Sequence, residues 1–262
     1  MMTKPLQALM LLTLLGANPL VWAQQALKQR YILEQENIDM ALTAQYEDGV
    51  RLSIAAMHRA GLGAEFNWQA SQHGSTYFYI RHSPTPKLEP ETRIRWMPAV
   101  LDDRDLQQYT SQINAAIRSR SVLMLEPRPQ FSYRPGQSID QARLNYVDIV
   151  HVHANRLERF YDATTRTIAA LEEAGYPFGF ETFEVIAGNP APAEGPSYYL
   201  ISPYNTRTQF YREYPLVGSI QKALGVEKAT RLLLGQRDNL ISGQSYDHIR
   251  RADLSYQTRD ER

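Results

Sequence analysis

Cysteine is absent from the 262-residue sequence, and this absence removes several kinds of chemistry. A chain without thiols forms no disulfide, has no thiolate nucleophile and cannot hold zinc or an iron–sulfur cluster through cysteine. An excess of charge of one sign is also lacking, because 28 Lys and Arg balance 28 Asp and Glu. We therefore expect no nucleic acid and no anionic membrane surface as a partner.

Recognisable cofactor and catalytic motifs are missing as well. The sequence contains neither a phosphate-binding P-loop nor a G-x-G-x-x-G fingerprint, so no nucleotide cofactor is expected. It contains no G-x-S-x-G elbow, and its Ser and His residues follow no triad pattern. We predict no cofactor and no metal centre, and the motifs leave any catalytic residue unknown.

The first residues have the pattern of a secretory leader. Lys4 precedes an apolar run from Leu6 to Leu15, and Val21-Trp22-Ala23 follows a helix-breaking stretch. We predict a signal peptide over 1–23, cleaved after Ala23, and a periplasmic or secreted mature protein. A run of about ten apolar residues is half the length of a membrane span, so we expect no membrane association after cleavage.

An internal repeat organises the rest of the sequence. Three pairs of segments match in the same order, at offsets of 114, 121 and 123 positions: 54–61 with 168–175, 75–80 with 196–201, and 132–133 with 255–256. Order and spacing kept together indicate a duplicated unit with small loop insertions. The increase from 114 to 121 places a seven-residue extension in a loop that includes Asn189-Pro190 and Gly195-Pro196.

Each copy has a periodicity that predicts the order β-α-β-β-α-β. Gly61 and Gly175 are expected to end the first helices, and Asn155 to cap the second copy's helix. A second helix is expected after Asp102, and its counterpart between Val217 and Leu234 is interrupted near Gly225. The predicted strands are Tyr31–Glu36, Phe66–Ala70, Tyr77–Arg81 and Ser121–Leu125, then Tyr146–Val152, Phe180–Ile186, Ser197–Ser202 and Gln244–Ile249.

This element order is that of a ferredoxin-like unit. We predict one unit over 24–133, a linker over 134–143 and a second unit over 144–262. The order and the duplication resemble the dimeric α+β barrel superfamily, which includes NIPSNAP-like proteins, antibiotic-biosynthesis-type monooxygenases and chlorite dismutases. The resemblance covers nearly the whole mature chain, but it lies in element order and transfers no catalytic residue.

The resemblance implies an α+β fold in which two tandem βαββαβ ferredoxin-like units pack as a pseudo-dimeric α+β barrel. The second copy would supply the surface that a homodimer partner otherwise provides, so we expect a monomer. The alternative fold is two separate ferredoxin-like domains joined by a flexible linker.

Aromatic side chains suggest a binding surface between the sheets. Tyr77, Tyr79 and Arg81 share one strand face, and Tyr198 aligns with Tyr77. We expect these four to face the space between the sheets and to bind an apolar or aromatic small molecule, while Phe78, Ile80, Tyr199 and Ile201 fill the opposite face under the helices. The alternative is that the tyrosines only hold the two sheets together.

Three further residues are candidates for the same site. His151 and His153 lie two apart on a predicted strand and would share a face. They would either ligate a metal with a third group supplied by the fold or lie solvated at the strand end. Glu181 aligns with Asn67 and places a carboxylate at a lumenal position of the second copy.

These features support three functional hypotheses. The leading one is an exported, non-catalytic protein that binds a small molecule or has a structural role. The first alternative is a cofactor-independent monooxygenase or isomerase, which requires a titratable residue with a shifted pKa in a closed lumen, His151 or Glu181. The second is a haem- or metal-binding barrel; however, His248 falls on a predicted strand, whereas chlorite dismutases are expected to place their axial histidine on a helix.

The leader prediction can be checked directly. N-terminal sequencing of the exported protein should begin at Gln24, because the peptidase is expected to cleave after Ala23. A mature protein that begins at Met1 would refute it.

Overall fold

The computed structural model of the protein describes residues 30–83, 97–133, 142–188 and 195–258. The predicted leader and the predicted loop extension at 189–194 lie outside these residues. The predicted linker also lies outside them, except for 142–143. Among the described residues, no helix is long and apolar enough to cross a membrane.

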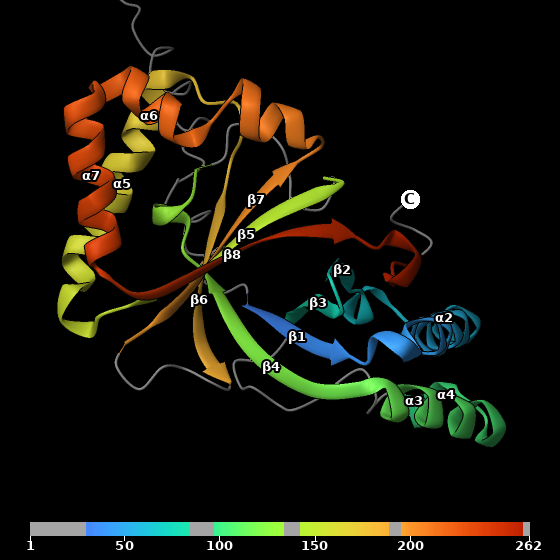
Figure 1. Ribbon diagram of the computed structural model, residues 1–262. Coiled ribbons are helices and arrows are strands. Elements are labelled where there is room, and N and C mark those ends of the chain that lie inside the picture. The colour runs from blue at the N-terminus through green and yellow to red at the C-terminus, as the bar shows by residue number, and fades with distance from the viewer. Residues whose placement is uncertain (1–29, 84–96, 134–141, 189–194, 259–262) are drawn as a thin grey trace, which may run out of the picture.

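Eight antiparallel strands close into one barrel, in the order β1-β3-β2-β8-β5-β7-β6-β4 (Figure 1). The N-terminal half supplies β1 (Arg30–Ile38), β2 (Gln69–His73), β3 (Thr76–Ser83) and β4 (Ile117–Pro127). The C-terminal half supplies β5 (Leu144–Val152), β6 (Glu181–Gly188), β7 (Ser197–Tyr204) and β8 (Leu240–Arg250). A single closed barrel excludes the alternative of two separate domains with independent sheets.

Helices cover the barrel on two opposite sides (Figure 1). The N-terminal half contributes α2 (Thr43–Ala60), α3 (Met97–Val100) and α4 (Asp103–Ala116), and the C-terminal half contributes α5 (Leu157–Ala174), α6 (Leu216–Leu224) and α7 (Val226–Asp238). Short 3₁₀ turns precede the first helix and follow the last strand of each half, and a π-helical turn, η6 (Gln209–Glu213), precedes α6. The predicted order β-α-β-β-α-β is thus present in both halves.

Most of the predicted helix boundaries are confirmed, with two corrections. Gly61 and Gly175 both have a φ of 64° and end α2 and α5, because glycine adopts the left-handed conformation without a Cβ clash. The Asp102 carboxylate accepts from the Asp105 amide at 2.8 Å and caps α4. Asn155 is not a helix cap: it lies inside the 3₁₀ turn before α5. Phe66 likewise lies in a 3₁₀ turn, and β2 begins three residues later.

The strands carry buried side chains on both faces, which the helices and the closed barrel together require. One apolar cluster lies under α2 and α4, a second under α5–α7. A third fills part of the barrel interior and contains Leu33, Phe78, Leu123, Leu125, Val147, Phe183, Tyr199 and Ile201.

The last strand of each half pairs with the other half. β4 pairs with β1 of its own half and with β6, whereas β8 pairs with β5 and with β2. The segment after β4 also contacts the C-terminal half. The Ser132 hydroxyl accepts from the Thr182 amide at 2.9 Å, and the Tyr133 hydroxyl donates to the Tyr176 carbonyl at 2.8 Å. These hydrogen bonds join the N-terminal half to the C-terminal half outside the barrel strands as well.

The matching Ser-Tyr pair makes the equivalent contacts after β8. The Ser255 hydroxyl accepts from the Ala70 amide at 2.9 Å, and the Tyr256 hydroxyl donates to the Leu62 carbonyl at 2.7 Å. Leu62 and Tyr176 each directly follow the glycine that ends the first helix of their half. The two Ser-Tyr pairs, which match in the sequence at an offset of 123 residues, thus make equivalent hydrogen bonds between the halves.

A charged network around Arg251 lies beside the contacts made by Ser255 and Tyr256. The Arg251 guanidinium donates to the Glu47 carboxylate at 2.5 Å and to the Gln72 side-chain oxygen at 2.6 Å, and it pairs with Asp253 at 2.9 Å. Tyr77 also donates to Glu47, at 2.7 Å. Hydrogen bonding from Arg251 lowers the pKa of Glu47 to about 2.

Replacement of Arg251 tests this network. We expect Arg251→Gln to lower the free energy of unfolding by about 1–3 kcal/mol at pH 7, because Glu47 loses a charge-assisted partner. The exposed pair Arg231–Glu227 provides the control, and Arg231→Gln should change stability by less than about 0.5 kcal/mol.

The pH dependence of the free energy of unfolding, measured by denaturant titration of wild type and Arg251→Gln, tests the same contact. The folded pKa of Glu47 lies below its ordinary value of 4.5, so its stabilising contribution is complete above about pH 5 and is lost as the pH falls toward 2. The difference between wild type and Arg251→Gln should shrink over that interval. A constant difference would contradict the role given to Glu47.

A candidate functional site inside the barrel

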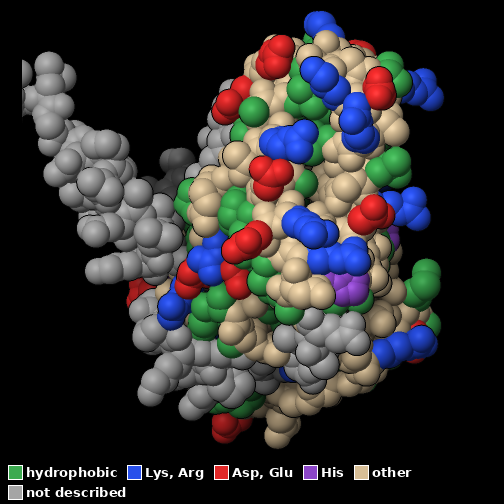
Figure 2. Space-filling model, turned by 90° about the vertical axis from the view of Figure 1, so that its left-hand side faces the viewer, with side chains coloured by type: hydrophobic (Ala, Val, Ile, Leu, Met, Phe, Trp, Pro, Cys, Tyr) green, Lys and Arg blue, Asp and Glu red, His purple; other side chains and the backbone are tan. Residues whose placement is uncertain are grey.

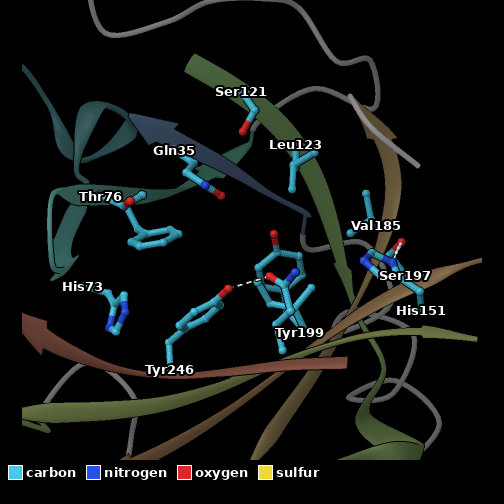
Figure 3. Close-up of a pocket in the computed structure, with 13 residues that line it drawn as sticks. Gln35, His73, Thr76, Ser121, Leu123, His151, Val185, Ser197, Tyr199 and Tyr246 are labelled. Atoms are coloured by element: carbon cyan, nitrogen blue, oxygen red, sulfur yellow. Dashed lines mark hydrogen bonds between the residues drawn. The ribbon is translucent and has the colours of Figure 1, made fainter. Parts of the chain in front are cut away.

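A cavity of about 370 Å³ lies inside the barrel, and every strand contributes to its wall (Figure 3). The lining residues are Gln35, His73, Thr76, Phe78, Ser121, Leu123, Ile149, His151, Val185, Ser197, Tyr199, Gln244 and Tyr246. Apolar and hydrogen-bonding side chains are mixed in this wall, which is the composition of a small-molecule site.

The predicted binding face of the strands is wrong. Tyr77, Tyr79 and Tyr198 lie on the outer face of the barrel under the helices, where Tyr79 shares a 2.6 Å hydrogen bond with Tyr46 of α2 and Tyr198 one of 2.7 Å with Tyr161 of α5. Arg81 has the same parity on β3 as the two tyrosines of that strand. The residues assigned to the helices, Phe78, Ile80, Tyr199 and Ile201, belong to the interior cluster instead.

The physical reason is that both faces of these strands carry aromatic side chains. Alternation correctly separates the residues into two sets, but it does not say which set meets the helices. Hydroxyl and carboxylate partners on α2 and a hydroxyl partner on α5 bind the polar tips of the outer tyrosines, so burial under a helix costs them little.

His151 is the predicted site residue that the structure does place in the cavity. Its ring lies on the same wall as Ser197, and its Nδ1 shares a 2.7 Å hydrogen bond with the Ser197 hydroxyl (Figure 3). Burial lowers the pKa of His151. The ring is therefore mainly neutral at pH 7, with one nitrogen anchored and a pKa shifted as the enzyme hypothesis requires.

His153 does not share that environment. β5 ends at Val152, a register shift separates His151 from Val152, and His153 precedes the 3₁₀ turn Ala154–Arg156. His153 therefore lies beyond the end of the strand and does not line the cavity, so the structure does not bring the two histidines together in one site. Glu181 pairs with Ile201 across β6 and β7 and so lies on the interior face, away from the residues that line the cavity.

The sequence patterns did not identify several residues that line the cavity, most importantly Tyr199 and Tyr246. The Tyr246 hydroxyl donates to the Gln244 side chain at 2.5 Å, and the ring of Tyr246 lies 4.7 Å from that of His73. Burial, and then the neighbouring Tyr246, raise the pKa of Tyr199 to about 12. In Figure 3 both tyrosines point toward the middle of the cavity, with His151 and His73 on opposite sides.

A second histidine is buried beside the cavity. The ring of His248 stacks on Phe78 at 4.2 Å, and its Nδ1 shares a 3.3 Å hydrogen bond with Ser71. Burial, followed by the proximity of His73, lowers its pKa to about 3. Its Nε2 is buried and has no hydrogen-bond partner within the described part of the chain. His248 therefore remains neutral and packs behind Phe78, which lines the cavity.

Another cavity, of about 850 Å³, lies outside the barrel between the strands of the C-terminal half and helices α5–α7. Haem, the group in the second alternative that the sequence raises, would need an axial ligand there. None of the chain's six histidines lines this cavity, and neither does a methionine. Burial raises the pKa of its tyrosines Tyr146, Tyr176 and Tyr211, which disfavours the phenolate needed to bind iron. The residues that line this cavity do not fit haem.

Metal ligands do not gather elsewhere in the described ranges. No group of three or more His, Asp or Glu side chains is placed there to hold an ion. His151 has Ser197 as its partner, and the predicted second ligand His153 lies beyond the strand.

The shifted pKa of His151 can be measured by NMR, with His151→Gln used to assign its ring resonances. We expect a folded-state pKa below 6.5, because burial disfavours the charged ring. Protonation then favours the unfolded state, so the wild type should lose stability relative to His151→Gln as the pH falls below about 6.5. A pKa at or above 6.5 would contradict the buried, neutral ring.

Comparison with known proteins gives a fold rather than a function. No protein-family model matches the chain, and no curated protein matches its sequence. An anthrone oxidase-like protein of known structure has a TM-score of 0.51 at 7% identity and covers 86% of this chain and 92% of its own.

Two further structures are similar at lower scores. A protein named provisionally as a monooxygenase, from Lactobacillus acidophilus NCFM, has a TM-score of 0.46 at 10% identity, and coverage of 88% and 96%. Chlorite dismutase from Candidatus Nitrospira defluvii has a TM-score of 0.49 at 8% identity, and coverage of 88% and 95%. The chain has an α+β fold with an eight-stranded antiparallel barrel, and its structural neighbours are dimeric α+β barrel proteins.

Proposed function

We propose that this protein is a cofactor-independent monooxygenase-type enzyme that removes a proton from a small aromatic carbon acid bound inside the barrel. The observation that carries the proposal is the neutral His151, anchored by Ser197 in the wall of a cavity that also contains two tyrosine hydroxyls. This enzyme alternative is better supported than the non-catalytic role that leads in the sequence.

His151 would act as the general base. When its Nδ1–H is donated to Ser197, Nε2 carries the free electron pair, and the lowered pKa keeps that pair available at pH 7. A general base works best when its pKa lies near the working pH. Burial of Ser197 helps to hold the ring in one orientation.

The tyrosines would stabilise the charge that develops on the substrate. The raised pKa of Tyr199 keeps its phenol protonated, so it donates a hydrogen bond to an enolate or phenolate oxygen. Tyr246 approaches from β8, and its hydroxyl would turn from the Gln244 side chain to donate to the same substrate oxygen. Apolar walls from Leu123, Ile149 and Val185 would exclude water and strengthen these interactions.

Anthrone is a suitable test substrate, because it is a carbon acid whose conjugate base is an aromatic enolate. Its oxidation consumes one O₂ per anthrone and yields anthraquinone and one water, so O₂ is the only oxidant required. The structural neighbour named as anthrone oxidase-like adds support for this choice. An isomerase would share the proton removal but would consume no O₂.

The proposal also covers the duplication of the chain, its oligomeric state and its export. The equivalent contacts of the two Ser-Tyr pairs support duplication of one ferredoxin-like unit, and the duplicated unit supports a monomer. The apolar run ahead of Ala23 supports export, after which the enzyme would work in the periplasm or outside the cell.

The test compares two histidine variants of the mature chain. We expect His151→Gln to lower kcat/KM for anthrone-dependent O₂ uptake by about 10²–10⁴-fold, the usual contribution of a general base. His153→Gln removes a neighbouring imidazole outside the cavity and should stay within about twofold of wild type.

The pH profile of the wild type separates a base from a structural role. kcat/KM should rise through the His151 pKa, below 6.5, and be level at pH 7. Wild-type protein that does not consume O₂ with anthrone, or equal rates in wild type and His151→Gln, would contradict the proposal.

A further inference from the structure

We propose that the larger cavity outside the barrel is a second binding site, which takes a neutral, mainly apolar molecule. The cavity of about 850 Å³ lies between the outer face of β5, β7 and β8 and helices α5–α7. It shares only Gln244 with the lining of the barrel cavity, so the two are separate sites.

The two halves of the protein differ at this position. Among the described residues of the N-terminal half, large, fully buried side chains pack between the strands and the helices, including Tyr46, Met97, Tyr109 and Ile113. In the C-terminal half, a cavity remains under α5–α7. Since the halves have the same element order, the element order alone does not produce this cavity.

The chain between β7 and β8 explains how the cavity forms. The N-terminal half has the four-residue α3 and then the single helix α4, whereas the C-terminal half has the π-helical turn η6 and then two helices, α6 and α7. Gly225 separates these helices with a φ of 78°, which favours glycine. A π-helical turn widens a helix locally and frequently occurs at functional sites.

The wall of the cavity indicates the class of ligand. Most of its side chains are aliphatic or aromatic, including Phe160, Phe180, Leu200, Phe210, Ile220 and Leu233. An unfilled apolar cavity lowers stability, whereas a ligand that fills it restores the lost contacts. The volume lies within the range of small-molecule sites, about 300–1,000 Å³.

Polar groups in the wall restrict the charge of the ligand. Asp148 lies in the wall, accepts a hydrogen bond from the Ser245 hydroxyl, and is adjacent to Tyr146. This half-buried carboxyl can hydrogen-bond a hydroxyl or amide, and Arg237 lines the same cavity, so the wall holds charges of both signs and favours neither an anion nor a cation. The ligand is therefore neutral, with a polar group that reaches Asp148.

The entrance is apolar too. Tyr211, Leu216 and Val217 line the cavity and yet are 45%, 40% and 48% exposed. Figure 2 shows the surface over the helices of the C-terminal half, where basic and acidic side chains are interspersed with hydrophobic ones. Because charges of both signs alternate on this face, it has no broad field that would attract a charged ligand.

The experiment uses the neutral fluorescent probe N-phenyl-1-naphthylamine and the mature chain. Gly243 lies in the wall, and a Cβ added there would meet Leu240 and Val150 at an ordinary 3.8 Å. Gly243→Phe should therefore fill part of the cavity without a backbone clash. We expect it to weaken probe binding at least tenfold, and Leu233→Trp, from a helix in the same wall, should do so as well.

Gly235→Phe is the matched control, because a Cβ at this exposed position of α7 meets nothing within 4 Å and the residue does not line the cavity. It should bind the probe as the wild type does. Anthrone turnover should be unchanged in both glycine variants, so this test is independent of the reaction in the barrel.

Three results would overturn the proposal. The first is probe binding that neither Gly243→Phe nor Leu233→Trp weakens. The second is displacement of the probe by anthrone, which would place it in the barrel. The third is a haem-type Soret band on addition of haemin that Gly243→Phe abolishes, since this would show that the cavity binds haem.

Discussion

The pairing of the last strand of each half with a strand of the other half is the interaction on which the rest of the structure depends. One of the two seams that close the barrel, β4 with β6, pairs five residues; the other, β2 with β8, pairs only Ser71 with Arg250 and Gln72 with Ile249. The shorter seam is reinforced by the segment that follows β8, where the Trp68 indole donates to the Leu254 carbonyl at 2.9 Å and Arg251 joins Glu47. Without this reinforcement, the wall that carries His73 and Tyr246 would open.

Closure of the barrel gives each strand two buried faces with different uses. The outer face packs under helices, and its tyrosines find hydroxyl and carboxylate partners there. The inner face encloses a cavity in which His151 is the one histidine held by a serine. The two halves therefore differ in two places, in the barrel wall and in the space under α5–α7.

Much of this fold could be predicted from the sequence, because its signals are local. Helical periodicity, the glycines at 61 and 175 and the repeated segments predict the element order and the pairing of equivalent residues. The orientation of the strands could not be predicted, since Tyr77 and Phe78, or Tyr198 and Tyr199, are equally suited to either buried face. The end of β5 at Val152, which leaves His153 outside the cavity wall, depends on the long-range pairing of β5 with β7 and β8, which no local pattern contains.

The central claim is that the barrel interior binds an aromatic carbon acid between His151 and the two tyrosines. A crystal structure of the mature protein with anthraquinone, the product, tests it most directly. The account predicts one molecule inside the barrel, with a carbonyl oxygen within hydrogen-bonding distance of Tyr199 or Tyr246 and the opposite ring carbon facing His151. Anthraquinone bound only outside the barrel, with the interior cavity empty, would contradict it.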